Sequence, residues 1–443
     1  MGSFIKNIKK QPAIIQRIFF RAVPFRWRYG KKFREHLEFL EKAESWSYDE
    51  AIAHQLLSLR KLLIHAKQNV PYYRDLFNEI GFDPNIKCFE DLKKIPLLTK
   101  DIIIANRVRL MDESYDGKHY KMNTSGTSGK RLDLVCSDDL FKIEAAYIYD
   151  ACRKHGIDLY RTHTVWLRRY SPGDGDEFYR HDYELNRTYL SAFHLNDETA
   201  HKYVSYINST KTESLISYPS TLYYLALLCE KHNLSLLYVK NMHGASEMCF
   251  PNWREKIREV FNINIKMHYG QVEKSIFAYQ DSENDMYNES LTYSYNEYME
   301  DGTVVGTGFH NTLMPLIRYR TEDRVRILQN AELTGSHPKT IEEIEGRNGD
   351  MLIHESGALL PAVNFYSFLS KCNFIDMFQI QQDRKTKDVT FSAIKSSLFD
   401  ETSEPYLKRE LTDRLGEVKI VFVYSEDLKR DSVTSKFKTI QVI

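Results

Sequence analysis

Strand-like runs alternate with helical runs from about Leu134 to Ile265. One example is the helical segment Tyr218 to His232, which is followed by the strand-like run Ser235 to Met242. Alternation of this kind is typical of a sheet covered by helices. The chain has 443 residues, and single cores seldom grow past roughly 250 to 300 residues. The sequence therefore predicts an α/β protein with a large domain and a small one.

The flanking regions predict three further parts. Helical spacing from Tyr48 to Gln68 predicts an N-terminal helical layer. The pair Asp301-Gly302 precedes the strand-like Val304-Val305, which indicates a hairpin in an antiparallel sheet or barrel element. After Gly349 the pattern predicts a small α+β domain with two strands, a helix near Pro405 to Leu415 and a strand at Val418 to Tyr424.

Charge is balanced overall but not along the chain. Lys plus Arg and Asp plus Glu both number 61, so net charge gives no reason to expect nucleic acid as the main partner. Residues 1–34 contain ten Lys or Arg and no acid. This segment suits an anionic membrane surface, and a helix docked on the protein's own body is the alternative. Its apolar residues are Ile14, Ile15, Ile18, Phe19, Phe20, Phe25 and Trp27.

Cysteine spacing and hydropathy bear on the compartment. No run of about 18 apolar residues occurs, and the N-terminus lacks the features of a secretory signal. We therefore expect a cytoplasmic protein. Contact with the inner face of the membrane through residues 1–34 is a further hypothesis. The six cysteines have no paired spacing, which predicts reduced, mostly structural thiols: Cys88, Cys136, Cys152, Cys229, Cys249 and Cys372.

The segment NTSGTSGKR, Asn123 to Arg131, alternates glycines with hydroxyl residues before two cations. Glycines let backbone amides approach phosphate oxygens, while hydroxyls and a lysine add donors and charge. It is not a Walker A loop, because two residues separate its glycines where that motif needs four. Taken alone, a flexible surface loop is the alternative. The residues predicted to contact a polyphosphate are Thr124, Ser125, Gly126, Thr127, Ser128, Gly129 and Lys130.

Four further segments complete a series that resembles the adenylate-forming superfamily of acyl-CoA ligases. HYGQVEKS (268–275) resembles its Tyr-Gly-x-x-Glu motif, and MPLIRYRTED (314–323) resembles Pro-Leu-x-Arg-Tyr-x-Thr-Gly-Asp. GRNGDMLI (346–353) resembles the Gly-Arg-x-x-Asp hinge, and TSKFK (434–438) resembles the C-terminal Ser-Gly-Lys loop. With VPYYRDLF and IPLLTK nearer the N-terminus, the resemblance covers nearly the whole chain. It is closest to the phenylacetate-CoA ligase branch, including relatives linked to capsule biosynthesis.

The resemblance implies a large N-terminal adenylate-forming domain and a small mobile C-terminal α+β domain. The large domain would combine layered sheets and helices with a β subdomain. Residues 1–100 would supply its basic segment and helical layer, and residues 101–349 its ATP- and acid-binding core. Residues 350–443 would form a lid that carries the catalytic lysine and rotates about a hinge at Gly349 and Asp350.

The resemblance also implies roles for individual residues. Glu273 would hold Mg²⁺ beside the phosphates, as a hard oxygen ligand does well. Asp323 would accept hydrogen bonds from the ribose hydroxyls, and Arg347 would reach the nucleotide. The alternatives are a surface charge for Glu273, a salt bridge to a neighbouring arginine (Arg320 or Arg324) for Asp323, and an ion pair with Glu345 for Arg347.

The remaining expected contacts lie between the phosphate loop and Gly270 of the HYGQVEKS segment. Further nucleotide contacts are expected from Gly244, Ala245, Ser246, Glu247, Tyr269 and Gly270. The acid pocket is expected from Tyr218, Pro219 and His243, for which ordinary core packing is the alternative. The polar run Trp166 to Tyr183 favours a hydrophilic substrate over a fatty acid.

Lys436 is the predicted catalytic lysine. When a carboxylate attacks the α-phosphate, negative charge spreads over the acid, the phosphoryl oxygens and pyrophosphate, so catalysis is mainly positioning and charge stabilisation. Lys438 is a rival, because Ser435 stands where the family has glycine. Other departures are Glu322, Val272 and Gln271, which suggest that substrate or acceptor handling has drifted.

The sequence is compatible with three functional hypotheses. The first is an acyl-CoA ligase that makes an acyl-AMP from ATP and a small acid and then a thioester with CoA. The second makes an amide with an amine acceptor in surface-polysaccharide biosynthesis. The third is a non-catalytic, membrane-associated relative, against which the joint presence of Glu273, Asp323, Arg347 and Lys436 counts. A homodimer is a further open expectation.

Overall fold

The computed structural model describes most of the chain, namely residues 7–123, 132–159, 161–168, 178–280, 284–328, 340–347, 351–361, 365, 368–369, 372–430 and 437–443. The chain divides into two compact units. Unit 1 comprises Met1–His163, His181–Arg187 and Lys266–Ile344. Unit 2 comprises Thr164–Arg180, Thr188–Ile265 and Glu345–Ile443. The predicted hinge at Gly349 and Asp350 lies outside the described residues, and the predicted domain limits stay a prediction.

Unit 1 begins with a helical layer, as predicted. Ser47 caps the long helix α5 by accepting from the Glu50 N–H while the Glu50 carboxylate accepts from the Ser47 N–H. Pro71 starts the next helix, because a residue without an N–H is tolerated at the first helical position. The helices are α2 (Ala13–Ala22), α3 (Phe25–Arg28), α4 (Lys31–Ala43), α5 (Tyr48–Asn69), α6 (Pro71–Glu79), the 3₁₀ helix η1 (Phe89–Lys94), α7 (Lys100–Asn106) and α8 (Asp138–Lys154).

A hairpin and a largely antiparallel sheet complete unit 1. Gly302 has φ +81° in the turn between β11 and β12, which confirms the predicted hairpin. A separate two-stranded hairpin consists of β1 (His119–Asn123) and β2 (Asp133–Ser137). The sheet strands run in the order β11 (Ser294–Tyr298), β12 (Thr303–Gly308), β13 (Tyr319–Ile327), β14 (Thr340–Arg347), β10 (Tyr287–Glu289), β9 (Phe277–Gln280) and β8 (Lys266–Gly270).

Two contacts fix the MPLIRYRTED segment in unit 1. The buried Tyr73 hydroxyl donates to the Pro315 carbonyl (2.9 Å) and accepts from the Ile317 N–H (3.0 Å). Arg318 makes two hydrogen bonds to the Glu297 carboxylate (2.8 and 2.7 Å), and both side chains are about nine-tenths buried. Arg318 therefore supports the segment structurally, through a bidentate pair of the stronger kind.

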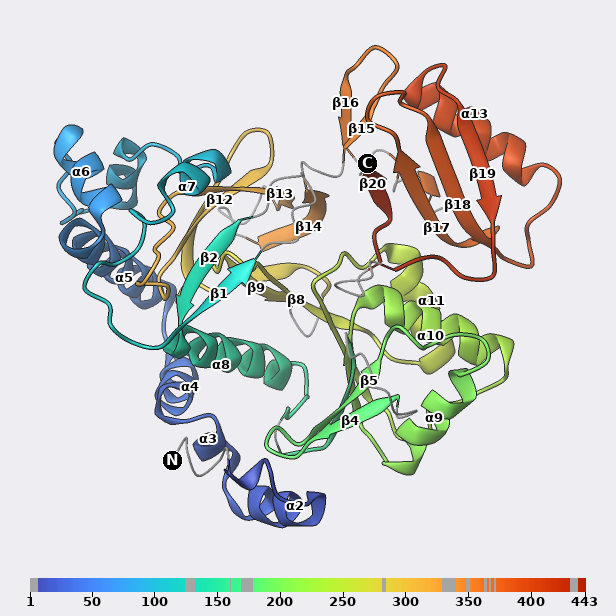
Figure 1. Cartoon of the computed structure of the whole chain (residues 1–443), viewed down its shortest axis with the longest axis horizontal. Coiled ribbons are helices and arrows are strands. Elements are labelled where there is room, and N and C mark those ends of the chain that lie inside the picture. Colours follow the sequence, from blue (N-terminus) through green and yellow to red (C-terminus); the bar gives the residue numbers. More distant parts are fainter. Residues whose placement is uncertain are drawn as a thin grey trace. The chain divides into compact units, whose positions relative to one another are not determined.

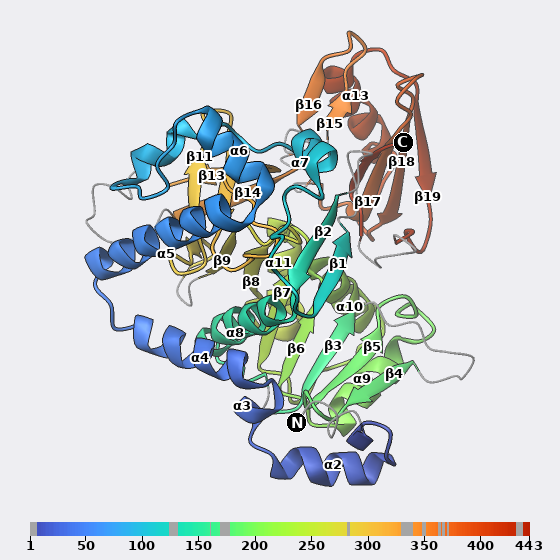
Figure 2. The same ribbon diagram turned by 60° about the vertical axis from the view of Figure 1, so that its left-hand side comes forward.

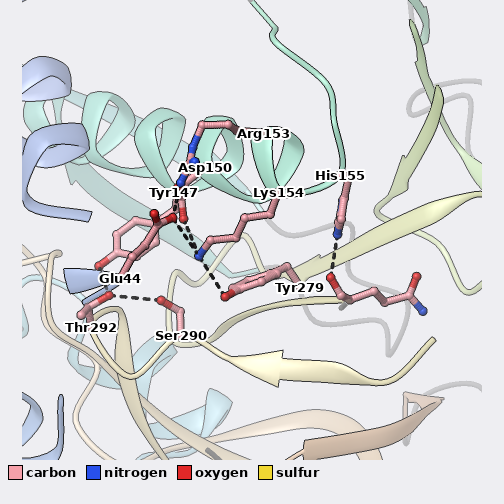
Figure 3. A network of polar contacts seen from close by, with 10 residues as sticks. Glu44, Tyr147, Asp150, Arg153, Lys154, His155, Tyr279, Ser290 and Thr292 are labelled. Carbon is pink, nitrogen blue, oxygen red and sulfur yellow. Dashed lines mark hydrogen bonds and ion pairs between the residues drawn. The ribbon is translucent and has the colours of Figure 1, made fainter. Parts of the chain in front are cut away.

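Helix α8 is tied to the sheet by a polar network (Figure 3). The Lys154 ammonium lies 2.9 Å from the buried Asp150 carboxylate and donates to the Tyr279 hydroxyl of β9 (3.0 Å). The Tyr147 hydroxyl donates to Thr292 (3.1 Å). On its other side α8 lies along α4 (Figure 2). The helix is thus fixed against the strand that follows the HYGQVEKS segment.

Unit 2 contains a parallel sheet with helices, as the alternating pattern predicted. The strand expected at Ser235 to Met242 is wrong in its bounds, because residues 235–240 form no strand and the strand there begins at Asn241. Strands β3 (Thr164–Arg168), β6 (Ser214–Ser217) and β7 (Asn241–Ala245) pair in parallel, in the order β7-β6-β3. Strands β5 (Arg187–Ser191) and β4 (Tyr179–Asp182) follow beyond β3. Helices α10 (Pro219–Lys231) and α11 (Pro251–Phe261) lie side by side, and α9 (Ala200–Ser209) contacts α10 (Figure 1).

The C-terminal part of unit 2 is a small α+β structure. A four-stranded sheet has the order β19 (Ile420–Tyr424), β18 (Val389–Lys395), β17 (Ile375–Gln382) and β20 (Ile440–Val442). Helix α13 (Ser403–Leu415) buries Leu407, Leu411 and Leu415, and Figure 1 shows it over this sheet. Strands β15 (Met351–Ile353) and β16 (Leu359–Pro361) form a separate hairpin. The predicted helix and strands of this part are therefore confirmed.

The N-terminal helix α2 has two different faces. Phe20 is buried, whereas Ile14, Ile15 and Ile18 are 62%, 43% and 63% exposed. Within the described ranges, no helix combines the length and apolar character needed to cross a bilayer. Helix α2 therefore buries Phe20 against the protein and leaves its isoleucines on the surface.

Candidate functional site

The first group of predicted site residues lies in unit 1, where β8 and β13 carry two of them. The Tyr269 hydroxyl, at the end of β8, donates to Oδ2 of Asp323 (2.6 Å). The Gln271 amide donates to the same Oδ2 (2.6 Å) and to the Tyr269 hydroxyl (2.8 Å). Asp323 is 6% exposed, so these hydrogen bonds replace most of its hydration. The carboxylate is consequently held in one orientation.

The turn after Gln271 carries Glu273. The Ser275 hydroxyl donates to Oε1 of Gln271 (2.6 Å), which fixes the amide so that its nitrogen faces Asp323. Lys274 has φ +58°, a left-handed conformation that tightens the turn. The Tyr319 hydroxyl donates to Glu273 (3.3 Å), and burial followed by the charges of Glu273, Glu322 and Asp323 raises the pKa of Tyr319. Tyr319 therefore stays a neutral donor to Glu273.

Ion pairs around this group involve neighbours rather than Asp323. Arg320 pairs with Asp301 (2.8 Å), so the structure does not support the alternative of a salt bridge from Arg320 to Asp323. Lys100, the lysine of IPLLTK, pairs with Glu322 (2.7 Å), which occupies the position of the family glycine. The side chains of Lys100 and Glu322 are 14% and 27% exposed. Glu322, which stands where the family has glycine, is therefore paired with a lysine.

The described residues fit a magnesium ion only in a limited sense. Glu273 is half-buried and offers carboxylate oxygens, which suit Mg²⁺. The described part of the chain contains no cluster of three or more His, Cys, Asp or Glu residues suited to a metal. Because Mg²⁺ is usually bound through one or two carboxylates plus substrate phosphates, a single Glu273 is compatible with it.

The second group lies in unit 2, at the carboxyl ends of three parallel strands. Strands β3, β6 and β7 end at Arg168, Ser217 and Ala245, and ligands of α/β sheets bind beyond such ends. The Arg168 guanidinium lies 4.6 Å from the Tyr218 ring centroid and 3.5 Å from the Ser246 hydroxyl. Ser246 has φ +72°, a rare conformation for a non-glycine residue and typical of functional turns.

The other predicted residues of this group take several positions. Pro219 is the first residue of α10, and His243, in β7, is fully buried. Gly244 and Ala245 end β7 and are also buried. Glu247 accepts hydrogen bonds from the Ser220 N–H (3.4 Å) and the Phe437 N–H (2.8 Å). Their roles in binding an acid or a nucleotide stay predictions.

Several predicted residues lie outside the described part of the chain. They are the phosphate-loop residues Thr124, Ser125, Gly126, Thr127, Ser128, Gly129 and Lys130, the hinge pair Gly349 and Asp350, and Lys436. Arg347 ends β14, but its side chain lies outside the description. Gly270 ends β8 next to Tyr269. The assignments for these residues remain predictions.

Three contributing residues were not predicted as site residues. Gln271 was noted only as a departure from the motif, although a polar side chain in an apolar position is itself a signal. Arg168 was noted only as part of a polar run. Arg430, which donates to the hydroxyls of Ser220 (3.2 Å) and Thr221 (3.1 Å), carried no local signal because its partners are distant in sequence.

Comparison with known proteins agrees with this geometry. No protein-family model matches the chain. Protein CapK of Staphylococcus aureus is 23% identical over 347 residues, covering 76% of each chain. Phenylacetate-coenzyme A ligase of Pseudomonas putida is 26% identical over 363 residues, covering 77% of this chain and 80% of the relative. The crystal structure of 2-hydroxyisobutyryl-CoA ligase in the postadenylation state superposes with a TM-score of 0.67, at 16% identity and 88% coverage of both chains.

The fold, the fixed Asp323 carboxylate and these similarities support the adenylate-forming superfamily. Within it, the similarity to CapK and to phenylacetate-coenzyme A ligases supports the phenylacetate-CoA ligase-like branch.

Proposed function

We propose that this chain is an ATP-dependent, AMP-forming acid ligase. A carboxylate attacks the α-phosphate of ATP, the bond to pyrophosphate breaks, and an acyl-AMP forms. The sulfur of CoA then attacks the acyl carbon, and AMP leaves. The observation that carries the proposal is the Asp323 carboxylate, which Tyr269 and Gln271 hold through Oδ2. Because a carboxylate has about four acceptor sites, it retains capacity for ribose hydroxyls.

The chemistry of the first step asks the protein mainly for positioning and charge. Glu273 would hold Mg²⁺, which would neutralise the phosphate oxygens. Lys436 would supply positive charge as pyrophosphate leaves, with Lys438 as the rival. The loop from Thr124 to Lys130 would bind the phosphates. Tyr218, Pro219 and His243 would line the acid pocket and orient the acid for attack.

Pyrophosphate release from Mg-ATP across a panel of carboxylic acids tests the proposal. We expect acid-dependent release by the parent and its near loss in Lys436→Ala. Lys408→Ala, on the exposed face of α13, is the matched control and should behave as the parent. Addition of CoA or of amines shows whether thioester or amide formation completes the reaction. Absence of ATP turnover with every acid would refute the ligase assignment.

We also propose a cytoplasmic protein that contacts the anionic inner face of a membrane through residues 1–34. The exposed isoleucines Ile14, Ile15 and Ile18 lie on a helix that also carries Arg17 and Arg21. Apolar side chains gain from burial in the interface, and each nearby cation contributes about 1 kcal/mol at an anionic surface. Docking through Phe20 leaves the isoleucines accessible, so the two alternatives for this segment are compatible.

Co-sedimentation with anionic and with zwitterionic vesicles tests this contact. We expect the parent to bind anionic vesicles, and Ile14→Ser with Ile18→Ser to abolish binding. The matched control is Leu237→Ser with Leu398→Ser, which removes two similarly exposed leucines elsewhere (68% and 60% exposed). Equal binding to both vesicle types, or none, would refute the proposal. A homodimer remains a prediction, which sedimentation velocity of the parent tests.

A further inference from the structure

The segment around the predicted catalytic lysine is held at both ends by one side chain. Gln379, on β17, donates from its amide nitrogen to the carbonyl oxygens of Lys429 (2.7 Å) and Lys438 (3.2 Å). Gln379 is 8% exposed, so both hydrogen bonds are shielded from water. The two ends of residues 429–438 are therefore fixed to the small sheet. Between them, the structure describes Arg430 and Phe437.

Arg430 attaches one end of this segment to the start of α10. Its guanidinium donates to the hydroxyls of Ser220 (3.2 Å) and Thr221 (3.1 Å), the second and third residues of the helix. Burial lowers the pKa of Arg430, while Glu247 and Asp427 act in the opposite direction. A cation at a helix N-terminus is electrostatically unfavourable. Glu247 offsets this, because its carboxylate accepts from the Ser220 N–H at the same helix end.

Phe437 attaches the other end. Its N–H donates to Oε1 of Glu247 (2.8 Å), and its ring centroid lies 6.2 Å from that of Trp253 in α11. Trp253 in turn stacks on Tyr223 of α10 (5.4 Å between centroids). Phe437 is 6% exposed, so an aromatic contact and a charge-assisted hydrogen bond hold the same residue.

Covalent geometry links this attachment to the predicted catalytic residue. The nitrogen of Phe437 belongs to the planar peptide group that joins it to residue 436. A hydrogen bond from that nitrogen to Glu247 restrains the chain at Phe437, the residue that follows Lys436 in the sequence. A lysine has four rotatable side-chain bonds, so restraint at its backbone is an efficient way to limit the positions of its ammonium.

We propose that Arg430, Glu247 and Phe437 form a latch that positions Lys436 for adenylation and is not needed for acyl transfer. This inference rests on the proposed ligase function and deepens it. Glu247 then acts as a positioning residue, and this role replaces direct contact with the nucleotide. Arg430 neutralises the Glu247 carboxylate and fixes the segment to α10. Substitution of Arg430 or Glu247 should therefore slow adenylation without slowing acyl transfer.

Separate assays of the two half-reactions test the latch. Adenylation is measured as acid-dependent exchange of labelled pyrophosphate into ATP, and transfer as single-turnover thioester formation from preformed acyl-AMP and CoA. We expect Arg430→Ala and Glu247→Gln to slow adenylation by about 10- to 100-fold, as small misplacements of catalytic groups do. The same variants should change transfer by less than about threefold, and the KM for ATP should stay near that of the parent.

The control is Glu426→Gln, a charge removal on an exposed side chain of the same part of unit 2. It should leave both half-reactions unchanged. Equal loss in both half-reactions would show a general structural role and overturn the latch. A rise in the KM for ATP with unchanged kcat in Glu247→Gln would instead establish nucleotide contact and also overturn it.

A readout independent of activity separates this inference from the proposed function. Hydrogen exchange at the Phe437 amide should accelerate in Arg430→Ala and in Glu247→Ala, which removes the acceptor, but not in Glu426→Gln. Unchanged exchange would refute the attachment itself. If the parent forms no acyl-AMP with any acid, the ligase function fails first, and the catalytic role of the latch fails with it.

Discussion

Gly306 of β12 lies against the carbonyl oxygen of Ser275, and a Cβ at residue 306 would come within 2.6 Å of that oxygen. A Cβ at Gly308 would overlap the carbonyl oxygen of Lys274. These are backbone atoms of the turn that carries Glu273, so the overlap cannot be relieved by a side-chain rotation. The absence of two side chains on β12 therefore sets how closely the turn approaches the sheet.

The first prediction concerns this close approach. Gly306→Ala or Gly308→Ala should displace the turn and weaken ATP binding, with a stability cost of about 1–3 kcal/mol for the overpacking. Isothermal titration calorimetry with ATP measures the affinity. Gly117→Ala is the control, because the atoms nearest to a Cβ there belong to the Tyr115 side chain and not to the backbone. Unchanged ATP affinity in both β12 variants would show that the turn does not contribute to the site.

The second prediction concerns Gln271. Gln271→Leu restores an apolar residue but removes a donor to Asp323 and to Tyr269. Hydrogen bonds to charged groups contribute about 1.5–3 kcal/mol, so the KM for ATP should rise by roughly 10- to 100-fold. Ser275→Ala should have a smaller effect in the same direction, because it only frees the Gln271 amide. A Gln271→Leu enzyme with parental kinetics would show that Tyr269 alone orients the carboxylate.

The third prediction concerns the buried pair of Arg318 and Glu297. Arg318→Met leaves the Glu297 carboxylate buried without this partner, and breaking such pairs costs about 3–5 kcal/mol. Urea unfolding followed by far-UV circular dichroism measures the loss. Arg320→Met is the matched control, since its pair with Asp301 is roughly half exposed and such pairs contribute at most about 1 kcal/mol. Similar losses in both variants would contradict the structural role given to Arg318.

The fourth prediction concerns Asp376 on β17. Burial, with Lys256 opposing and Glu230 assisting, raises the pKa of Asp376 to about 6. A raised carboxyl pKa means that ionisation costs folding free energy, so the parent loses stability as pH rises from about 4 to 6. The cost above pH 6 is at most about 3 kcal/mol. Asp376→Asn avoids this ionisation cost, so its free energy of unfolding should exceed that of the parent at pH 7 but not at pH 4.

Urea unfolding at several pH values checks this, with Trp253 fluorescence as a local signal. The Tyr223 hydroxyl bonds to the backbone carbonyl of Asp376, so the substitution keeps that contact. Asp413→Asn, on the exposed face of α13, is the control. A parent and an Asp376→Asn variant with parallel pH profiles would contradict the raised pKa.

Local patterns predicted the elements of the fold because each depends on neighbouring residues. The turn glycine Gly302 acts within a few residues, and it was recognisable in the sequence. The motifs led to Asp323, Tyr269 and Glu273 in the same way. The pairing of Asp323 with Gln271 was not predicted, because it depends on how the fold brings β13 close to the turn that follows β8.

Contacts between segments that are distant in the sequence could not be predicted from neighbouring residues. Arg430 meets Ser220 across 210 positions of sequence, and Phe437 meets Glu247 across 190. No sequence pattern near Arg430 distinguishes it from the other arginines of the chain. Only the fold that brings α10 and the C-terminal segment of unit 2 together assigns these residues a common role.

The pairing of Lys100 with Glu322 constrains how this motif can change by mutation. Restoring glycine at residue 322 alone removes the carboxylate 2.7 Å from a lysine that is only 14% exposed. Replacing Lys100 alone removes the cation that lies 2.7 Å from the Glu322 carboxylate. Either single step passes through a less stable intermediate, so the two positions are epistatic and exchange most readily as a pair. The order of substitutions, and not only their identity, thus governs return to the family motif.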